Sequence, residues 1–253
     1  MKRFVYLYLL AMVLLSCIKT TNESVSDVAD CYGAIVKRDS TKKTVYFIFS
    51  ADSLFEGADT ILRVLDKHSI KGSFFFTGNC LRMPEHQDKI SRIISGGHYV
   101  GGHSDKHILY ADWDKERTNM VSDDSLKRDI SANYVELERF GITKDEVPYF
   151  LPPYEWYNEQ NIKAIKDMGL VPVNFTTGLY TSDDYTTPDM ANYKSSQALI
   201  DVLMRYEETH TLNGSIILIH PGTSPLRTDK LYHRLDEIIT SLKSKGYQFD
   251  RLK

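Results

Sequence analysis

Stretches typical of buried strands alternate along this chain with stretches typical of amphipathic helices, and this order restricts the fold more than any other feature. Residues 44–49 and 215–220 are continuous runs of apolar and β-branched residues, as in strands that are covered on both faces. Residues 58–68 instead carry apolar residues between Ile61 and Leu65 at the spacing of one helix face. Such alternation is typical of a parallel sheet whose strands are joined by helices.

The same patterns predict about seven strands and the helices between them. The strands are expected at residues 44–49, 71–78, 98–100, 147–151, 170–175, 215–220 and 247–252. The helices are expected at residues 58–68, 84–95, 123–140, 158–168, 196–211 and 228–245. No linker or shift of composition interrupts the series, so residues 43–253 are predicted to form one α/β domain that is similar to a (β/α) barrel.

The N-terminal residues are predicted to be an export signal rather than part of this domain. A short basic start, residues 1–3, precedes an apolar stretch, residues 4–15, which is too short to span a bilayer comfortably. The stretch ends in Leu-Leu-Ser-Cys at Cys17, which resembles a bacterial lipoprotein signal; an ordinary signal peptide that contains a cysteine is the alternative. We therefore expect residues 1–16 to be a signal peptide, residues 17–42 to form a tether and N-terminal segment, and a lipid on the cysteine to anchor the exported protein in the bacterial envelope, on its periplasmic or cell-surface face.

The composition disfavours some partners and leaves others open. The formal charge of −3 at pH 7 provides no basic field, so no nucleic-acid partner is expected. No Cys-x-x-Cys motif occurs, which disfavours a thiolate metal site, although Cys31 and Cys80 could pair in an exported protein. The 16 Tyr and 11 Phe residues suit either core packing or stacking on sugar rings.

Two histidines four residues apart, His103 and His107, follow the third predicted strand. If a helix begins at Ser104, the two imidazoles lie on one face and could bind one metal ion. The preceding Gly101-Gly102 would allow the backbone to turn sharply. Histidines at this spacing can equally be surface or capping residues, so a metal site requires a third ligand from elsewhere in the chain.

Other polar residues stand at the ends of the predicted strands. Asp52 follows the first strand, Glu155 lies beyond the fourth, Asn174 ends the fifth and His220 ends the sixth. Taken singly, Asp52 could cap a helix and His220 could be a buried core residue. A parallel barrel, however, brings the carboxyl ends of its strands to one edge, where these groups would converge with the histidine pair.

Several short motifs now indicate a family. Val45–Phe49 leads to Asp52 where the family has Thr-Phe-Asp-Asp, and His103–His107 matches its His-Ser/Thr-x-x-His. Phe150–Tyr154 stands where the family has Phe-Arg-Pro-Pro-Tyr, and Leu218–His220 matches its Leu-x-His. From about residue 43 to 252, the chain therefore resembles the polysaccharide deacetylases of the NodB-homology type, carbohydrate esterase family 4.

The resemblance implies a distorted (β/α) barrel that carries a divalent metal, usually zinc, although nickel, cobalt or iron suit the same ligands. It implies that Asp52, His103 and His107 hold the metal. It also implies that the backbone N–H of Tyr154 stabilises the oxyanion and that His220 protonates the leaving amine or alcohol. The residues expected to contact the acetylated poly- or oligosaccharide are Pro153, Trp156, Tyr157 and Leu218.

The first motif departs from the family pattern. A strict alignment places Ser50 and Ala51 on the two Asp positions, of which one supplies the general base and one a metal ligand. We expect Asp52, one position further along, to supply the ligand, because two histidines alone hold a metal poorly. The base has no counterpart, and the Arg that pairs with it is Leu151 here. Losing both is self-consistent, since a buried Arg without its carboxylate would be an unpaired charge.

Other residues could replace what is missing. Glu155 follows the motif tyrosine, and Asp105 lies between the two histidines; either could contact the metal-bound water. An exposed position at the rim is the alternative interpretation of Glu155. The strand that ends near Asn174 offers no carboxylate to tune His220.

Two functions of different classes follow from these patterns. The first is a metal-dependent deacetylase that removes N- or O-acetyl groups from a glycan at the envelope. The second is a metal- and glycan-binding homologue whose barrel has lost hydrolysis, which the missing base and its Arg support. Another metal-assisted hydrolysis, such as that of a peptidoglycan amidase, is a further alternative.

Overall fold

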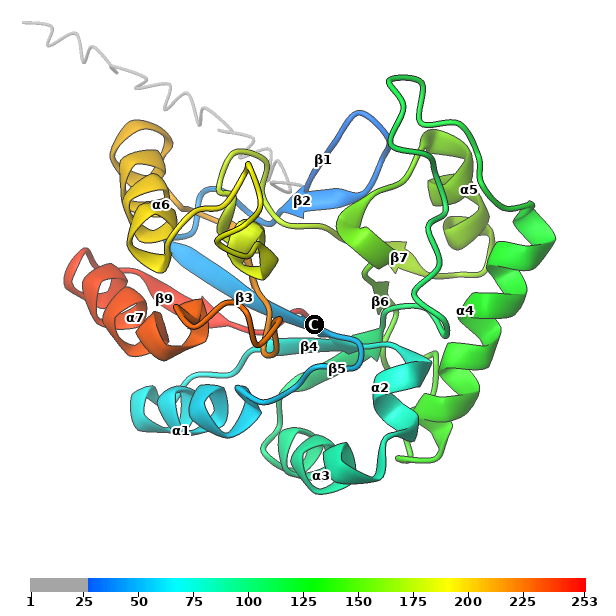
Figure 1. Cartoon of the computed structure of the whole chain (residues 1–253), viewed down its shortest axis with the longest axis horizontal. Helices are drawn as coiled ribbons and strands as arrows, with labels where there is room; N and C mark the ends of the chain where they lie inside the picture. Colours follow the sequence, from blue (N-terminus) through cyan, green and yellow to red (C-terminus); the bar gives the residue numbers. More distant parts are fainter. Residues whose placement is uncertain (1–26) are drawn as a thin grey trace, which may run out of the picture.

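The centre of the fold is a curled sheet of seven parallel strands, seen in a computed structural model that describes residues 27–253 (Figure 1). The predicted signal peptide and Cys17 lie outside the described residues. The strand order is β7 (Val171–Pro172), β6 (Tyr149–Phe150), β5 (Tyr99–Gly102), β4 (Ser73–Phe76), β3 (Thr44–Ala51) and β8 (Ile216–Ile219), and β9 (Gln248–Asp250) also pairs with β3. Every one of these pairings is parallel. The predicted α/β class with about seven parallel strands is confirmed.

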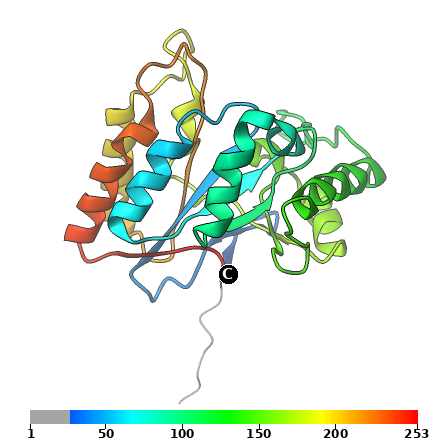
Figure 2. The same cartoon turned by 90° about the horizontal axis from the view of Figure 1, so that it is seen from below.

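Helices cover the sheet at the places that the sequence pattern predicts. Helix α1 (Ala58–His68) buries its apolar stripe, including Ile61 and Leu65. The other long helices are α3 (Gln87–Ser95), α4 (Asp123–Glu138), α5 (Glu159–Asp167), α6 (Ser196–His210) and α7 (Leu235–Ser244). Two short 3-10 turns, η1 (Pro84–His86) and η4 (Leu231–Arg234), lead into α3 and α7. Figure 2 shows α7, α1 and α3 side by side on one face of the sheet.

Several short elements were not predicted. They are β1 (Val28–Ala29), β2 (Ile35–Lys37), α2 (Gly78–Arg82), η2 (Pro153–Glu155) and η3 (Thr181–Tyr185). Strand β2 forms isolated bridges from Ile35 to Val173, beyond β7, and from Lys37 to Ser215, before β8. Part of the N-terminal segment therefore packs between the two edges of the sheet and helps to close it.

Phenylalanines from adjacent strands fill the core. The rings of Phe49 and Phe74 stack with centroids 4.8 Å apart, and Phe47 and Phe76 continue the stack on either side. All four side chains are buried. Core packing therefore accounts for these phenylalanines, while the exposed aromatics considered below lie elsewhere.

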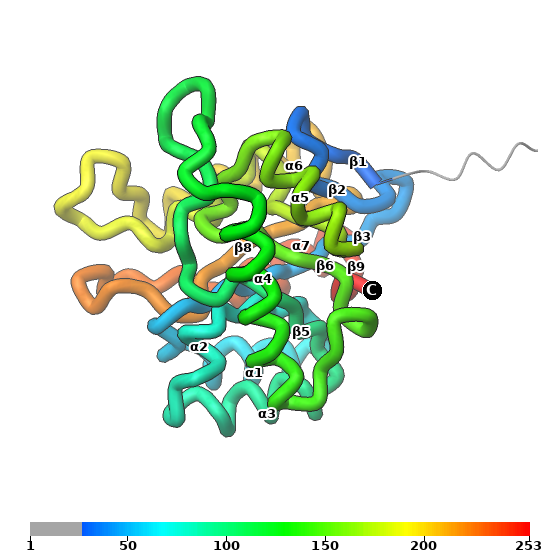
Figure 3. Tube along the Cα trace, turned by 90° about the vertical axis from the view of Figure 1, so that its right-hand side faces the viewer, coloured from blue at the N-terminus to red at the C-terminus, as the bar shows by residue number. Residues whose placement is uncertain are grey.

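Because the strands are parallel, the loops that follow them project from one edge. Figure 3 shows the segments after β7 and β8, in yellow and orange, projecting together on the left. No helix between residues 27 and 253 is both long and apolar enough to cross a membrane.

Candidate functional site

His103 and His107 lie in the loop after β5, and the expected helix at Ser104 is absent from this loop. Residues 103–109 are irregular, and Ser104 and His107 have φ angles of 70° and 53°. These two left-handed residues wind the loop so that the imidazole centroids of His103 and His107 lie 5.0 Å apart. The loop conformation, rather than a helix, brings the two rings together.

The glycines before His103 provide space rather than a sharp turn. Gly102 lies within β5, and a Cβ atom at this position would come within 2.5 Å of Asn133 Oδ1. The buried Asn133 side chain, from α4, accepts a hydrogen bond from the His103 backbone N–H (3.1 Å). It also donates one to the carbonyl of Phe76 (3.0 Å). Asn133 thus ties α4 to the ends of two strands and fixes the position of His103.

His103 directs its second ring nitrogen toward a buried carboxylate. Its Nδ1 lies 2.8 Å from the carbonyl oxygen of Leu151, and because a carbonyl only accepts, Nδ1 carries the proton. The unprotonated Nε2 lies 3.7 Å from Glu155 Oε1, an oxygen that is buried and has no hydrogen-bond partner. Burial, and then the neighbouring His107, lower the pKa of His103 well below its ordinary value. The ring is therefore a neutral donor of one lone pair.

An unusual backbone directs Glu155 inward. Tyr154 and Glu155 are consecutive residues with positive φ, 59° and 53°, a conformation that costs energy in residues other than glycine. Asn174 Nδ2 donates to the carbonyl of Glu155 (3.0 Å) and to the hydroxyl of Tyr157 (2.9 Å), which supports this turn. The Glu155 side chain is only 11% exposed, and burial raises its pKa to about 7. Glu155 is thus an inward carboxylate and not an exposed rim residue.

Asp52 follows the end of β3, and hydrogen bonds occupy one of its oxygens. Oδ1 accepts from Thr77 Oγ1 (2.8 Å) and from Asn79 Nδ2 (3.0 Å). Burial lowers the pKa of His107, and the nearby charge of Asp52 opposes this. Within residues 27–253, no three His, Cys, Asp or Glu side chains stand as a complete, ready-made set of metal ligands. The side chains of Asp52, His103 and His107 share one edge of the sheet without forming a closed ligand set.

His220 follows β8 and is paired with a carboxylate that the sequence did not indicate. Its Nδ1 lies 2.5 Å from Asp184 Oδ1, and its backbone N–H donates to Asp184 Oδ2 (2.9 Å). Burial disfavours the charged imidazole, but the Asp184 carboxylate outweighs this and raises the pKa of His220 above its ordinary value. With Nδ1 donating to Asp184, Nε2 faces away from the pair and can act on a substrate.

A buried arginine holds the segment that carries Asp184. Arg227, in the loop after β8, is fully buried and donates to the carbonyls of Thr186 (2.7 Å), Lys194 (3.0 Å) and Asp229 (2.7 Å). It therefore joins the loop after β8 to the loop after β7. Asp184 was missed because it is one of several acidic residues in a Thr- and Asp-rich loop, and no local pattern distinguishes it from its neighbour Asp183.

Three other motif residues, Asp105, Ser50 and Leu151, bring no free carboxylate or guanidinium to the site. Asp105 is buried against Arg82, with which it forms an ion pair, so its carboxylate does not serve the two histidines. Ser50, at a family Asp position, is buried within β3, and its Oγ has no hydrogen-bond partner. Leu151, at the family Arg position, is fully buried and contributes only its carbonyl, to His103.

The aromatic residues after the fourth strand divide into exposed and buried ones. The Tyr154 ring is 42% exposed and lies 4.2 Å, centroid to centroid, from the ring of His107. Trp156 is partly buried, and its indole N–H donates to the carbonyl of Asp112 (2.9 Å). Pro153, Tyr157 and Leu218 are buried, whereas Tyr154 and Trp156 are exposed or partly exposed.

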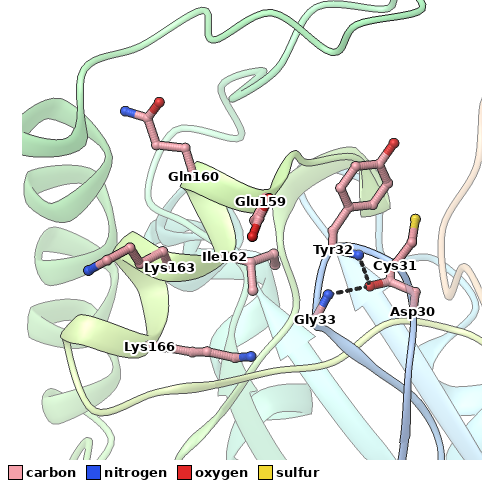
Figure 4. Close-up of a pocket in the computed structure, with 9 residues that line it drawn as sticks. All are labelled: Asp30, Cys31, Tyr32, Gly33, Glu159, Gln160, Ile162, Lys163 and Lys166. Carbon is pink, nitrogen blue, oxygen red and sulfur yellow. Dashed lines mark hydrogen bonds between the residues drawn. The ribbon is translucent and has the colours of Figure 1, made fainter.

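A cavity of about 610 Å³ lies apart from these groups (Figure 4). Its lining includes Tyr32 and Gly33, in the turn after β1, and Ile162 and Lys166 of α5. Asp30 Oδ1 shapes the turn by accepting the backbone N–H groups of Tyr32 (3.0 Å) and Gly33 (2.8 Å). No residue of the candidate site contributes to its lining.

The chain is similar in sequence to a protein family and to individual proteins. A family model described as polysaccharide deacetylase matches residues 37–173. An uncharacterised protein of Geobacillus stearothermophilus is 27% identical over 90% of this chain and 76% of its own length. The peptidoglycan-N-acetylmuramic acid deacetylase PdaA of Bacillus subtilis is 26% identical, over the same shares of the two chains.

Solved structures share the fold. The crystal structure of BA3943 from Bacillus anthracis, described as a CE4 family pseudoenzyme, has a TM-score of 0.68 at 23% identity, covering 87% of this chain and 67% of that one. A BA3943 mutant described as having restored enzymatic activity also has a TM-score of 0.68 at 23% identity, covering 87% of this chain and 70% of that one. At this level of identity the likeness establishes the fold alone.

Proposed function

Because the chain belongs to the polysaccharide deacetylase family, we propose that it hydrolyses N- or O-acetyl groups of a glycan at the bacterial cell envelope. The family consists of hydrolases that act on acetylated glycans. The observation that carries the proposal for this chain is the His220–Asp184 pair, which leaves His220 Nε2 available as a proton donor. The similarity to PdaA makes peptidoglycan the first glycan to test.

The chain's own residues can account for the proton transfers of hydrolysis. Water adds to the acetyl carbonyl carbon, and the Glu155 carboxylate, which faces the site with an unpaired oxygen, accepts the proton that the water loses. The backbone N–H of Tyr154 donates to the oxygen that becomes negative. The bond from carbon to nitrogen or oxygen then breaks, and His220 transfers its proton to the leaving amine or alcohol. The products are acetate and a deacetylated sugar.

Members of this family generally depend on a metal, and we propose that Asp52, His103 and His107 hold a divalent cation here, with zinc the expected ion. The fit is supported by His103, whose Nδ1 donates to a carbonyl while Nε2 faces an orphaned carboxylate oxygen at 3.7 Å. A cation held at Nε2 would place positive charge close to this carboxylate. When bound, it would polarise the acetyl carbonyl. Nickel, cobalt or iron suit the same donors.

The second candidate function is binding of a metal and a glycan without hydrolysis. The observation that favours it is the absence of a carboxylate at Ser50 and Ala51, with a buried leucine, Leu151, where the family has arginine. The fold occurs in a protein described as a pseudoenzyme, BA3943, and in a mutant of it described as having restored activity.

We further propose that the protein is exported and held at the membrane by a lipid on Cys17, with residues 1–16 removed and the following residues, to 42, forming the tether and N-terminal segment. The Leu-Leu-Ser-Cys sequence supports this arrangement. Mass spectrometry of the mature N-terminus would detect the lipid. A Cys17→Ala variant would move from the membrane fraction to the soluble fraction if the proposal is correct.

One experiment tests the main proposal. Purified protein is analysed for metal content and then assayed for acetate release from peptidoglycan and other acetylated glycans. Bound metal with acetate release would support the deacetylase. Bound metal without acetate release, from every glycan and with every added divalent metal, would favour the binding protein.

A further inference from the structure

The two edges of the sheet differ in charge. The segments between each strand and the next α-helix, at the edge of the candidate site, contain 7 Lys or Arg residues and 11 Asp or Glu residues. The segments that lead into strands β3 to β9, together with residues 251–253, contain 9 and 3. We call this second edge the basic edge. Its basic residues are Arg38, Lys42, Lys43, Lys71, Arg139, Lys144, Lys245, Arg251 and Lys253, and its acidic residues are Asp39, Asp145 and Glu146.

Residues 251–253 run along the basic edge. The backbone N–H of Leu252 donates to Oγ of Ser73, the first residue of β4 (2.9 Å). The hydroxyl of Tyr149, the first residue of β6, donates to the carbonyl of Lys253 (3.2 Å). Figures 2 and 3 show this end of the chain on the side of the sheet away from the yellow and orange segments after β7 and β8. Arg251 and Lys253 are therefore held at the edge opposite the candidate site.

The segment that enters the domain meets the same edge. Asp27, the first described residue, forms an ion pair with Arg38 (3.0 Å), whose guanidinium also donates to the Tyr149 hydroxyl. Only residues 18–26 separate Asp27 from Cys17. An extended chain spans at most about 3.6 Å per residue, so a lipid on Cys17 would hold the basic edge within roughly 35 Å of a bilayer.

Some cations of the basic edge are not neutralised by neighbouring carboxylates. Five of its basic residues are in ion pairs: Arg38–Asp27, Lys42–Asp39, Arg139–Glu136, Lys245–Glu207 and Lys253–Asp250. Lys43, Lys71 and Arg251 form no ion pair with a carboxylate of residues 27–253. Lys43 and Lys71 are exposed, and Arg251 lines a cavity of about 460 Å³ beside Arg38 and Lys42. These three side chains can therefore bind an external anion.

We infer that the basic edge contacts the phosphate groups of anionic phospholipids, so that the anchored protein lies with its candidate site turned away from the bilayer. This inference rests on the proposed lipid anchor. Lysine and arginine side chains near an anionic membrane surface strengthen binding to it, and the acidic residues of the opposite edge are repelled by the same surface. The separation of charge thus favours one orientation. The short connection to Cys17 favours a bilayer over a soluble polyanion, because it keeps this edge close to the membrane.

Vesicle binding by a chain without the lipid tests the edge by itself. This chain would comprise residues 17–253 with Cys17→Ala, since the sheet and its helices lie within residues 27–253. Co-sedimentation would compare vesicles that contain phosphatidylglycerol with vesicles of phosphatidylcholine alone. We expect binding to the anionic vesicles only, and weaker binding as salt is added.

Two matched double variants locate the binding surface. Lys43→Gln/Lys71→Gln should weaken binding to the anionic vesicles about twentyfold, because each such cation contributes about fivefold. Lys106→Gln/Lys115→Gln removes the same charge from exposed lysines at the edge of the candidate site and should leave binding unchanged. Since all four lysines are exposed, both variants should fold, and circular dichroism would verify this.

Lysine labelling of the lipidated protein in the same vesicles tests the orientation. An amine-reactive reagent, read by mass spectrometry, should label Lys43, Lys71 and Lys253 severalfold less in anionic than in phosphatidylcholine vesicles. Lys106 and Lys115 should be labelled equally in both, because they lie at the other edge.

Three outcomes would overturn the inference: no binding to anionic vesicles at low salt, equal weakening in the two double variants, or binding to soluble polyphosphate without binding to vesicles. The proposed anchor fails in a different way. A mature N-terminus without lipid would disprove the anchor, while the unlipidated chain would still show whether the basic edge binds phospholipid. Neither measurement uses acetate release, so the proposed hydrolysis is tested separately.

Discussion

The two halves of the candidate site differ in whether the candidate catalytic side chain already has a partner. On the side of β8, Nδ1 and the backbone N–H of His220 are both bonded to Asp184, and Arg227 fixes the surrounding loops. In the other half, Glu155 Oε1, in η2 after β6, is buried without a partner, as is Ser50 Oγ in β3. Buried polar atoms in native proteins are nearly always bonded, so unpaired ones require an explanation.

The difference indicates which half is ready before a ligand arrives and which half the ligand completes. Leaving one buried polar group unpaired costs roughly 1–3 kcal/mol. A metal, a water or a substrate that bonds to Glu155 recovers that energy, whereas the His220–Asp184 pair gains nothing comparable. We therefore interpret the first half as a preformed proton donor and the second as the place where metal and substrate bind.

The largest expected effect comes from breaking the preformed half. His220→Ala removes the proposed proton donor for the leaving group, and we expect the acetate-release rate to fall by about 10²–10⁴-fold. Metal content should not change, because His220 is not a proposed ligand. Elemental analysis beside the activity assay checks both statements. Undiminished turnover in a folded His220→Ala protein would remove His220 from the mechanism.

Glu155→Gln tests the other half and should have the next largest effect. The amide has nearly the same shape but accepts a proton far less readily, so we expect kcat to fall by about a hundredfold. Asp105→Asn is the matched control, since Asp105 is a buried carboxylate near the same loop but pairs with Arg82. A kcat that Glu155→Gln leaves at the wild-type level would assign the base to another group.

Asp52→Ala should weaken metal binding rather than the chemical step. If Asp52 supplies the carboxylate ligand, its loss should reduce metal affinity by at least about 10–100-fold, which titration with zinc would measure. Thr77→Val is the control, because it removes a hydrogen bond to the same carboxylate and the side-chain cap of α2 but no proposed metal ligand. Stoichiometric metal in Asp52→Ala, together with metal loss in Glu155→Gln, would transfer the ligand role to Glu155.

The sequence predicted the framework well because the framework depends on short-range patterns. The apolar stripe of α1 and the continuous strand at β3 each lie within about ten residues, and the structure has both within two residues of the predicted positions. The parallel topology also predicted that the polar residues at the strand ends, including His103 and His220, lie at one edge of the sheet. The elements that were missed, such as α2 and β2, are too short for any period to be visible.

The site itself could be predicted only in part, because its pairings are long-range. Asp184 reaches His220 across 36 positions, and Glu155 is directed inward only by two consecutive left-handed residues supported by Asn174. Nothing in the local sequence requires a tyrosine or a glutamate to adopt positive φ. The prediction of a helix after β5 was wrong for the same reason. Ser104 and His107 adopt positive φ in this loop, and its first residue, His103, is held by a hydrogen bond to the buried Asn133.

The smallest expected effect comes from weakening the preformed half without removing it. In Asp184→Asn the amide has one acceptor oxygen for the two N–H groups that the Asp184 carboxylate accepts, and with that oxygen on the proton of His220 Nδ1 we expect the rate at the optimal pH to fall about tenfold. The pH profile is the sharper measurement. Burial lowers the pKa of His220, whereas the Asp184 carboxylate and, to a smaller extent, Glu155 raise it above the ordinary value, so removing the Asp184 charge lowers this pKa. His220 must be protonated to donate, and activity is therefore lost as the pH rises through its pKa.

The alkaline limb of the kcat profile should accordingly move to lower pH in Asp184→Asn, while Asp183→Asn, at the neighbouring position, should leave it in place. An alkaline limb that stays fixed in both variants would mean that a group other than His220 sets it, and the two halves of the site would no longer divide as proton donor and binding side.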